Sequence, residues 1–70
     1  MKRTHSRPEE VSVEIDGSTY LGTFRVESKV VIVAAAFGSG STHLGSLSAE
    51  HVARLLLRDI VAGAKARGEL

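Results

Sequence analysis

The stretch VVIVAAAF, residues 30–37, is an uninterrupted apolar run in a chain of 70 residues. The other strand-like stretches of the sequence alternate apolar and polar side chains instead. A strand that is apolar at every position has both of its faces out of water. Since the chain contains one plausible helix, which covers one face, the other face needs a partner.

Upstream of this run, residues 11–15 alternate strictly, with Val11, Val13 and Ile15 on one side. They end at Asp16-Gly17, a pair typical of two-residue hairpin turns, because glycine adopts positive φ without a steric penalty. Such a turn sets Ile15 opposite Ser18, Val13 opposite Tyr20 and Val11 opposite Gly22. The apolar sides of the two strands, 11–15 and 18–27, then lie on one face.

A second tight turn near residues 27–29 leads into the apolar run and places Val31, Val33, Ala35 and Phe37 on the inner face. Val30, Ile32, Ala34 and Ala36 then point outward. In a three-stranded meander this third strand is an edge strand, and an edge that is apolar on both faces invites pairing with another chain. Residues 38–41, GSGS, are expected to form a simple loop, with a possible short fourth strand at 42–44.

Residues 49–66 have a helical period, with Ser48 as the expected N-cap and Glu50 in the first turn. Their apolar arc covers about 180° and leaves Leu55 outside it. The opposite face carries basic side chains: His51, Arg54, Arg58 and Lys65. We therefore predict an α+β fold, a three- to four-stranded antiparallel β-sheet with one C-terminal helix packed on one face. Residues 1–10 are expected to form a flexible arm, and residues 11–70 a single βββα domain.

The composition narrows the classes of function. Without cysteine the chain has no disulfide and no thiolate zinc site, and its three histidines lack the spacing of metal ligands. A net charge of +1 gives weak long-range attraction to nucleic acid or lipid. A chain of this size seldom gains more than roughly 3 to 5 kcal/mol from a single core, so oligomerisation is a common remedy. We expect a soluble cytoplasmic protein that makes no membrane contact.

Two motifs resemble functional sites but lack their essential parts. Residues 38–42, GSGST, have neither the lysine of a P-loop nor the third glycine of a dinucleotide fingerprint. Ser41, His43 and Asp59 contain the residue types of a hydrolytic triad without a nucleophile elbow. We predict that the protein is not an enzyme and that it has no catalytic residues, no cofactor and no metal.

Three segments together resemble a family of small uncharacterised bacterial proteins, a domain of unknown function. They are DGSTYLGTFRV at 16–26, GSGSTHLG at 38–45 and ARLLLR at 53–58. The resemblance covers most of the chain after residue 10. It implies a strand-strand-strand-helix build and carries no catalytic residue over to this chain.

The leading functional hypothesis is a small interaction module that forms a homodimer through the outer sheet face and the edge strand, or binds an unidentified protein there. The residues proposed for this interface are Leu21, Ile32, Ala34 and Leu55. The alternative is weak nucleic-acid binding, in which basic side chains contact phosphates. Its candidate residues are Arg25, Arg54, Arg58 and Lys65, with Lys2, Arg3 and Arg7 of the arm.

Overall fold

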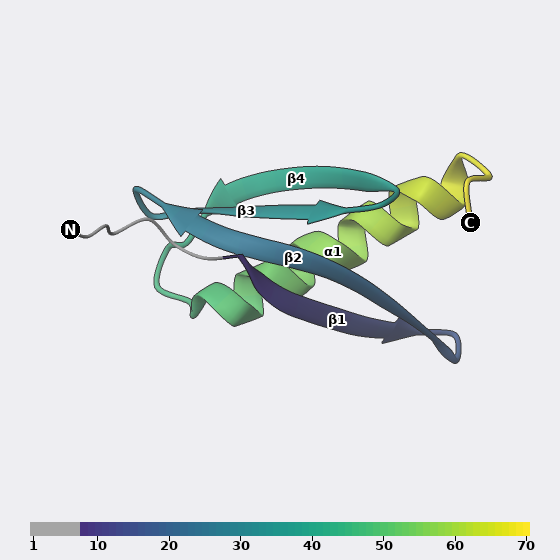
Figure 1. The fold of residues 1–70 in the computed structure, drawn as a ribbon, viewed down its shortest axis with the longest axis horizontal. Coiled ribbons are helices and arrows are strands. Elements are labelled where there is room, and N and C mark those ends of the chain that lie inside the picture. Colours follow the sequence, from purple (N-terminus) through teal and green to yellow (C-terminus); the bar gives the residue numbers. More distant parts are fainter. Residues whose placement is uncertain (1–7) are drawn as a thin grey trace.

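The computed structural model describes residues 8–70 and forms four strands followed by one helix (Figure 1). The elements are β1 (Glu9–Ile15), β2 (Ser18–Glu27), β3 (Val30–Ala35), β4 (Gly38–His43) and α1 (Ala49–Ala66). Glu9 and Glu10, which we assigned to the arm, belong to β1. The rest of the predicted arm, residues 1–7, lies outside the described residues.

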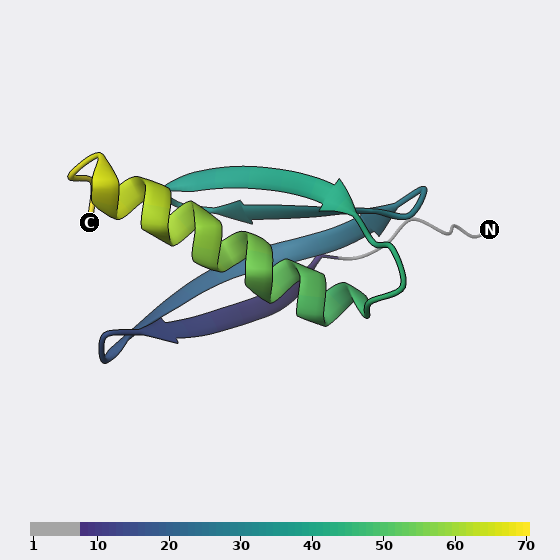
Figure 2. The ribbon, with the colours of Figure 1, turned by 180° about the vertical axis from the view of Figure 1, so that it is seen from behind.

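The strands form one antiparallel sheet in the order β1-β2-β3-β4, and α1 crosses one face of it diagonally (Figure 2). The predicted α+β fold is confirmed. The first hairpin has the predicted register, with Ile15 opposite Ser18 and Val13 opposite Tyr20. Asp16 and Gly17 both have positive φ, 53° and 81°, as a turn that matches the twist of its strands requires.

The expected edge position of the apolar strand is wrong. β3 ends at Ala35, a turn follows at residues 36–37, and β4 then pairs along the full length of β3. The segment expected to be a loop is therefore a strand, from Gly38 opposite Ala35 to His43 opposite Val30. Its glycines and serines have little intrinsic preference for strands, but the ladder to a buried neighbour satisfies their backbone groups. β3 is therefore a central strand, paired on one side with β2 and on the other with β4.

The core lies between the inner face of the sheet and α1. Leu57 and Val61 of the helix and Val31 and Val33 of β3 are completely shielded from solvent. Phe37 packs against this core and contacts Tyr20 edge to face, with ring centroids 6.0 Å apart. The remaining buried apolar residues are Val11, Val13, Phe24, Val52, Ala53 and Ala64.

Both ends of α1 are capped by local hydrogen bonds. The Ser48 hydroxyl accepts a hydrogen bond from the backbone N–H of His51 at 3.2 Å, which confirms the predicted N-cap. At the other end the N–H of Glu69 donates to the Ala64 carbonyl and the N–H of Gly68 to the Lys65 carbonyl. This is a Schellman motif, in which Gly68 supplies the left-handed residue with φ of 77°.

The turn between β2 and β3 offers a stabilising substitution. Ser28 and Lys29 have φ of 51° and 64°, a left-handed conformation that is unfavourable for non-glycine residues. We expect the double substitution Ser28→Asn, Lys29→Gly to raise the free energy of unfolding by about 1 kcal/mol. Urea unfolding followed by circular dichroism measures the gain. The same pair placed at Thr42 and His43, within β4, is the control and should destabilise the protein.

Candidate interaction surfaces

The outer face of the sheet is the side away from α1. Residues directly opposite each other on antiparallel neighbours share a face, and one such row is Arg25, Ile32 and Ser41. The next row contains Thr23, Ala34 and Ser39. No element of residues 8–70 covers this face, and the Leu21 side chain on it is 55% exposed.

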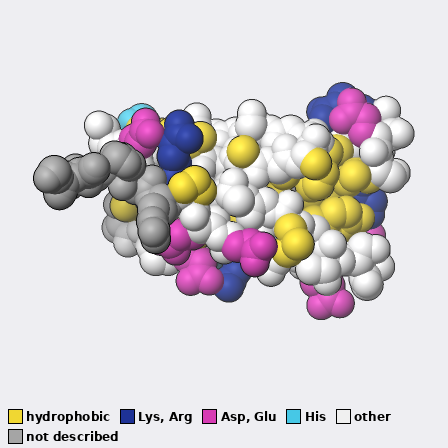
Figure 3. Space-filling view, in the orientation of Figure 1, with side chains coloured by type: hydrophobic (Ala, Val, Ile, Leu, Met, Phe, Trp, Pro, Cys, Tyr) yellow, Lys and Arg dark blue, Asp and Glu magenta, His cyan; other side chains and the backbone are white. Residues whose placement is uncertain are grey.

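Apolar side chains form several spots on this face, with polar or backbone surface and acidic side chains between them (Figure 3). Leu21, Thr23 and Ala34 line a shallow depression of about 410 Å³. Towards one end of the sheet, Arg25 donates a hydrogen bond to Glu27 at 2.8 Å. The outer face thus combines exposed apolar groups, small hydroxyl side chains and the Arg25–Glu27 ion pair with two carboxylates along β1, Glu14 and Glu10, of which Glu10 also lines the depression. Apolar groups bordered by polar and charged side chains are typical of a contact surface with a polar rim.

Of the four residues proposed for a dimer interface, the structure brings Leu21, Ile32 and Ala34 to the outer face and leaves Leu55 elsewhere. Leu55 is 48% exposed and lies with Val13 and Arg58 in a groove of about 350 Å³ between β1 and α1. The helix and the outer sheet face are on opposite sides of the sheet, so Leu55 cannot share a flat interface with Ile32.

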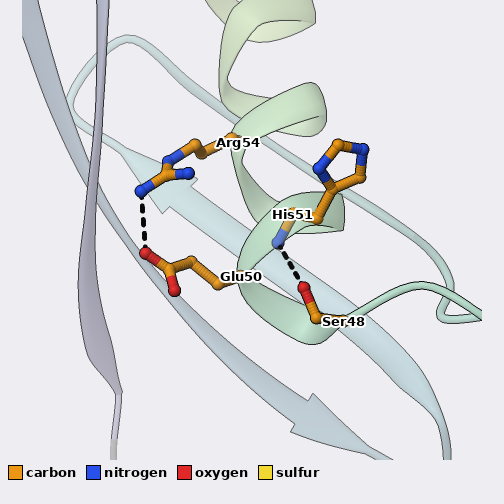
Figure 4. Close-up of polar contacts among 4 residues, drawn as sticks. All are labelled: Ser48, Glu50, His51 and Arg54. Carbon is orange, nitrogen blue, oxygen red and sulfur yellow. Dashed lines mark hydrogen bonds and ion pairs between the residues drawn. The ribbon is translucent and has the colours of Figure 1, made fainter.

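The four cations proposed for nucleic-acid contact are divided among three places. Arg54 and Arg58 both line the groove beside β1, where Arg54 also donates a hydrogen bond to Glu50 at 2.8 Å (Figure 4). Lys65, near the end of α1, contacts the Asp16 carboxylate at 3.2 Å. Arg25 lies on the outer sheet face. The arm residues Lys2, Arg3 and Arg7 lie outside the described residues.

A third surface, which our sequence interpretation missed, is a groove of about 320 Å³ between β4 and α1. Gly38 and Gly40 form its strand side, and Leu56 and Ile60, one helical turn apart, form its helix side. Two sequence signals for this groove were present: glycines at alternating positions, Gly38 and Gly40, and the apolar pair Leu56 and Ile60 at i and i+4. That these two signals lie next to each other follows only once residues 38–43 are known to form a strand beside the helix.

Two charged residues lie at the rim of the β4–α1 groove, Asp59 and Arg67. Arg67 donates two hydrogen bonds to Glu69, at 3.0 and 3.1 Å. These hydrogen bonds, and then the charge of the guanidinium, hold the pKa of the Glu69 carboxyl below its usual value. The same contacts raise the pKa of Arg67. Both groups are therefore charged at neutral pH, and Glu69 offsets the positive charge of Arg67.

The three residues of the rejected triad do not form one cluster. Ser41 and Asp59 both line the β4–α1 groove, but His43 does not. By register, Ser41 and His43 lie opposite Ile32 and Val30, which are outer-face positions, whereas Asp59 belongs to α1 on the other side of the sheet. Within residues 8–70 no group of three histidine, aspartate or glutamate side chains is placed to hold a metal ion. In the same part of the chain, no helix combines the length and apolar character that crossing a membrane requires.

Comparisons of this chain with protein-family models, curated proteins and solved structures find no match. The resemblance to small uncharacterised bacterial proteins therefore stays a prediction.

Proposed function

We propose that the protein is a small cytoplasmic interaction module, without catalytic activity, that forms a homodimer through the outer face of its sheet. The observation that carries this proposal is the position of Leu21, 55% exposed, at a depression that it shares with Ala34. This depression lies on the outer face, which also carries Ile32 and which no described element covers. A single-layer sheet normally buries one face and exposes polar residues on the other. Exposed apolar groups on the second face favour a partner surface.

The size of the face predicts the strength of the dimer. Four strands of six to ten residues, spaced about 4.8 Å apart, give a flat area of roughly 450 Å². A standard interface buries about 800 Å² of accessible surface on each partner. The outer face by itself is smaller than a standard interface, so we expect a reversible dimer that dissociates on dilution.

Charge substitution on the outer face tests the dimer. We expect Ile32→Asp to raise the dimer dissociation constant at least tenfold, because the association would bury a carboxylate. Arg25 lies directly opposite residue 32, so the new carboxylate has a cation beside it in the folded monomer. The measurement is light-scattering mass over a wide dilution range, with thermal unfolding to confirm the fold.

The matched control is Leu55→Asp, which puts the same charge at an exposed leucine on the helix side of the sheet. It should leave the dissociation constant unchanged. A parent protein that is monomeric at every concentration, or equal effects of the two substitutions, contradicts the proposed dimer.

The alternative, weak nucleic-acid binding, has less support. Among the described residues, carboxylates engage three of the four candidate cations, and these cations occupy different surfaces. Affinity for nucleic acid comes mainly from several free cations aligned along the phosphate backbone. We therefore place self-association first.

A further inference from the structure

The outer edge of β4 offers backbone hydrogen-bonding groups to a further strand. Within residues 8–70, β4 has a neighbour only on the side of β3. The Leu44 N–H bonds to the Lys29 carbonyl across that boundary at 2.8 Å. Because successive residues of an antiparallel strand direct their N–H and C=O groups to alternate sides, the outward-facing groups belong to Ser39, Ser41 and His43.

β4 also lacks the features that protect sheet edges. Charged side chains, proline and bulges normally discourage edge pairing. The other edge strand, β1, carries Glu9, Glu10 and Glu14. β4, with the sequence GSGSTH, has no lysine, arginine, carboxylate or proline, and it pairs with β3 without a bulge. The two edges of this sheet therefore differ in their readiness to accept a strand.

The groove beside β4 has room for side chains of that added strand. A Cβ atom built on Gly40 would lie 3.8 Å from Leu56 Cδ2 and 3.9 Å from Ile60 Cδ1, which is ordinary van der Waals contact. The groove is thus open above Gly40 and bounded by two partly buried apolar side chains. In an added strand, the residue opposite Gly40 forms a non-hydrogen-bonded pair, the closer of the two pair types. Its side chain would lie against Leu56 and Ile60.

The charge of the groove favours a cationic partner. None of the ion pairs among the described residues involves Asp59, whereas Glu69 neutralises Arg67. A lysine or arginine two residues from the apolar anchor projects to the same side of an added strand. From there it reaches the rim where Asp59 lies.

We propose that β4 and this groove bind an extended segment of a partner protein by strand addition, with a large apolar side chain opposite Gly40 and a lysine or arginine that pairs with Asp59. Main-chain hydrogen bonds supply affinity in this mode of recognition, and alternate side chains supply specificity. A second copy of β4 fits less well, since it would bring glycines and no cation to the groove. This site lies on another surface from the proposed dimer and is independent of it.

The first test selects ligands from a phage-displayed library of random ten-residue peptides. We expect enriched sequences with a large apolar residue and, two positions away, a lysine or arginine. A synthetic consensus peptide is then titrated against the parent protein and against two variants. Gly40→Val should weaken binding at least tenfold because valine fills the groove, and Asp59→Asn should weaken it several-fold.

The matched control for Gly40→Val is Ser12→Val, which adds a branched side chain to the other edge strand, opposite Leu21 and away from the β4–α1 groove. It should bind the peptide with unchanged affinity, and thermal unfolding confirms that each variant folds. Failure to enrich any peptide over the Gly40→Val protein, or equal losses in the two valine variants, overturns the proposal.

Amide hydrogen exchange provides a separate signature. Peptide binding should slow exchange at Ser39, Ser41 and His43, and change Gly40 and Thr42 little, since the last two face β3. The experiment uses the Ile32→Asp protein, in which the proposed dimer is weakened, so that changes in exchange caused by dimerisation are not mistaken for peptide binding. Slowed exchange at the first three amides with rising protein concentration alone would instead show pairing between two copies of β4 and overturn the proposal of a foreign segment.

Discussion

Replacing Leu57 by alanine is expected to leave the protein largely unfolded near room temperature. Leu57 is fully shielded from solvent at the centre of the contact between α1 and the sheet. Removing a buried leucine side chain costs about 2–5 kcal/mol, including the cavity left behind. A single core of this size supplies roughly 3–5 kcal/mol in total. The loss therefore approaches the whole free energy of unfolding.

Circular dichroism during urea unfolding, at one fixed protein concentration, measures this loss and keeps any contribution of dimerisation constant. Leu55→Ala is the matched control, because it is the same substitution on the same helix at a side chain that is 48% exposed. It should change the free energy of unfolding by no more than about 0.5 kcal/mol. Similar losses for the two variants would contradict the packing described for α1.

The helix and the first hairpin were predictable because their signals are local. Ser48 identifies the start of α1, the apolar period identifies its buried face, and Asp16-Gly17 fixes the register of β1 and β2. Each of these features acts over a few residues. The predicted inner positions Val31 and Val33 are confirmed for the same reason, since alternation along a strand follows from one known register.

β4 was not predictable in this way, because its glycines and serines gain strand structure only by pairing with β3. Strand preference measures how well side chains fit a packed surface, and β4 has few side chains to fit. The sequence suggested only a short fourth strand at residues 42–44, and treating residues 38–41 as a loop placed the sheet edge at the wrong position. The groove against Leu56 and Ile60 was missed with it, since it exists only where the helix and β4 meet.

The central position of β3 also changes the argument for a partner. The apolar run does not need a foreign strand at its edge, because β2 and β4 pair with both of its sides. What still requires explanation is the outer face, where Ile32 and Ala34 accompany Leu21. The two proposed surfaces therefore rest on different observations: exposed apolar groups for the outer face, and unprotected backbone beside an open groove for β4.

Two glycines on the inner face of the sheet should respond in opposite ways to the same substitution. A Cβ atom on Gly22 would lie 2.9 Å from the Ala34 carbonyl oxygen and 3.3 Å from Leu57 Cδ1. The carbonyl belongs to a strand paired on both sides, and Leu57 is completely buried. Neither neighbour moves without disturbing the core, so we expect Gly22→Ala to lower the free energy of unfolding by about 1–3 kcal/mol.

Gly40→Ala is the matched control, because its nearest neighbour would be 3.8 Å from the new methyl group. Alanine restricts the unfolded chain more than glycine does, which stabilises the folded state by about 0.4–1 kcal/mol where the backbone permits it. Urea unfolding of both variants measures the difference. Equal stability of the two would mean that α1 is not held closely over Gly22. A clear difference supports the description of the inner face as closed at β2, beneath Leu57, and open at β4, where we propose that a partner's side chain enters.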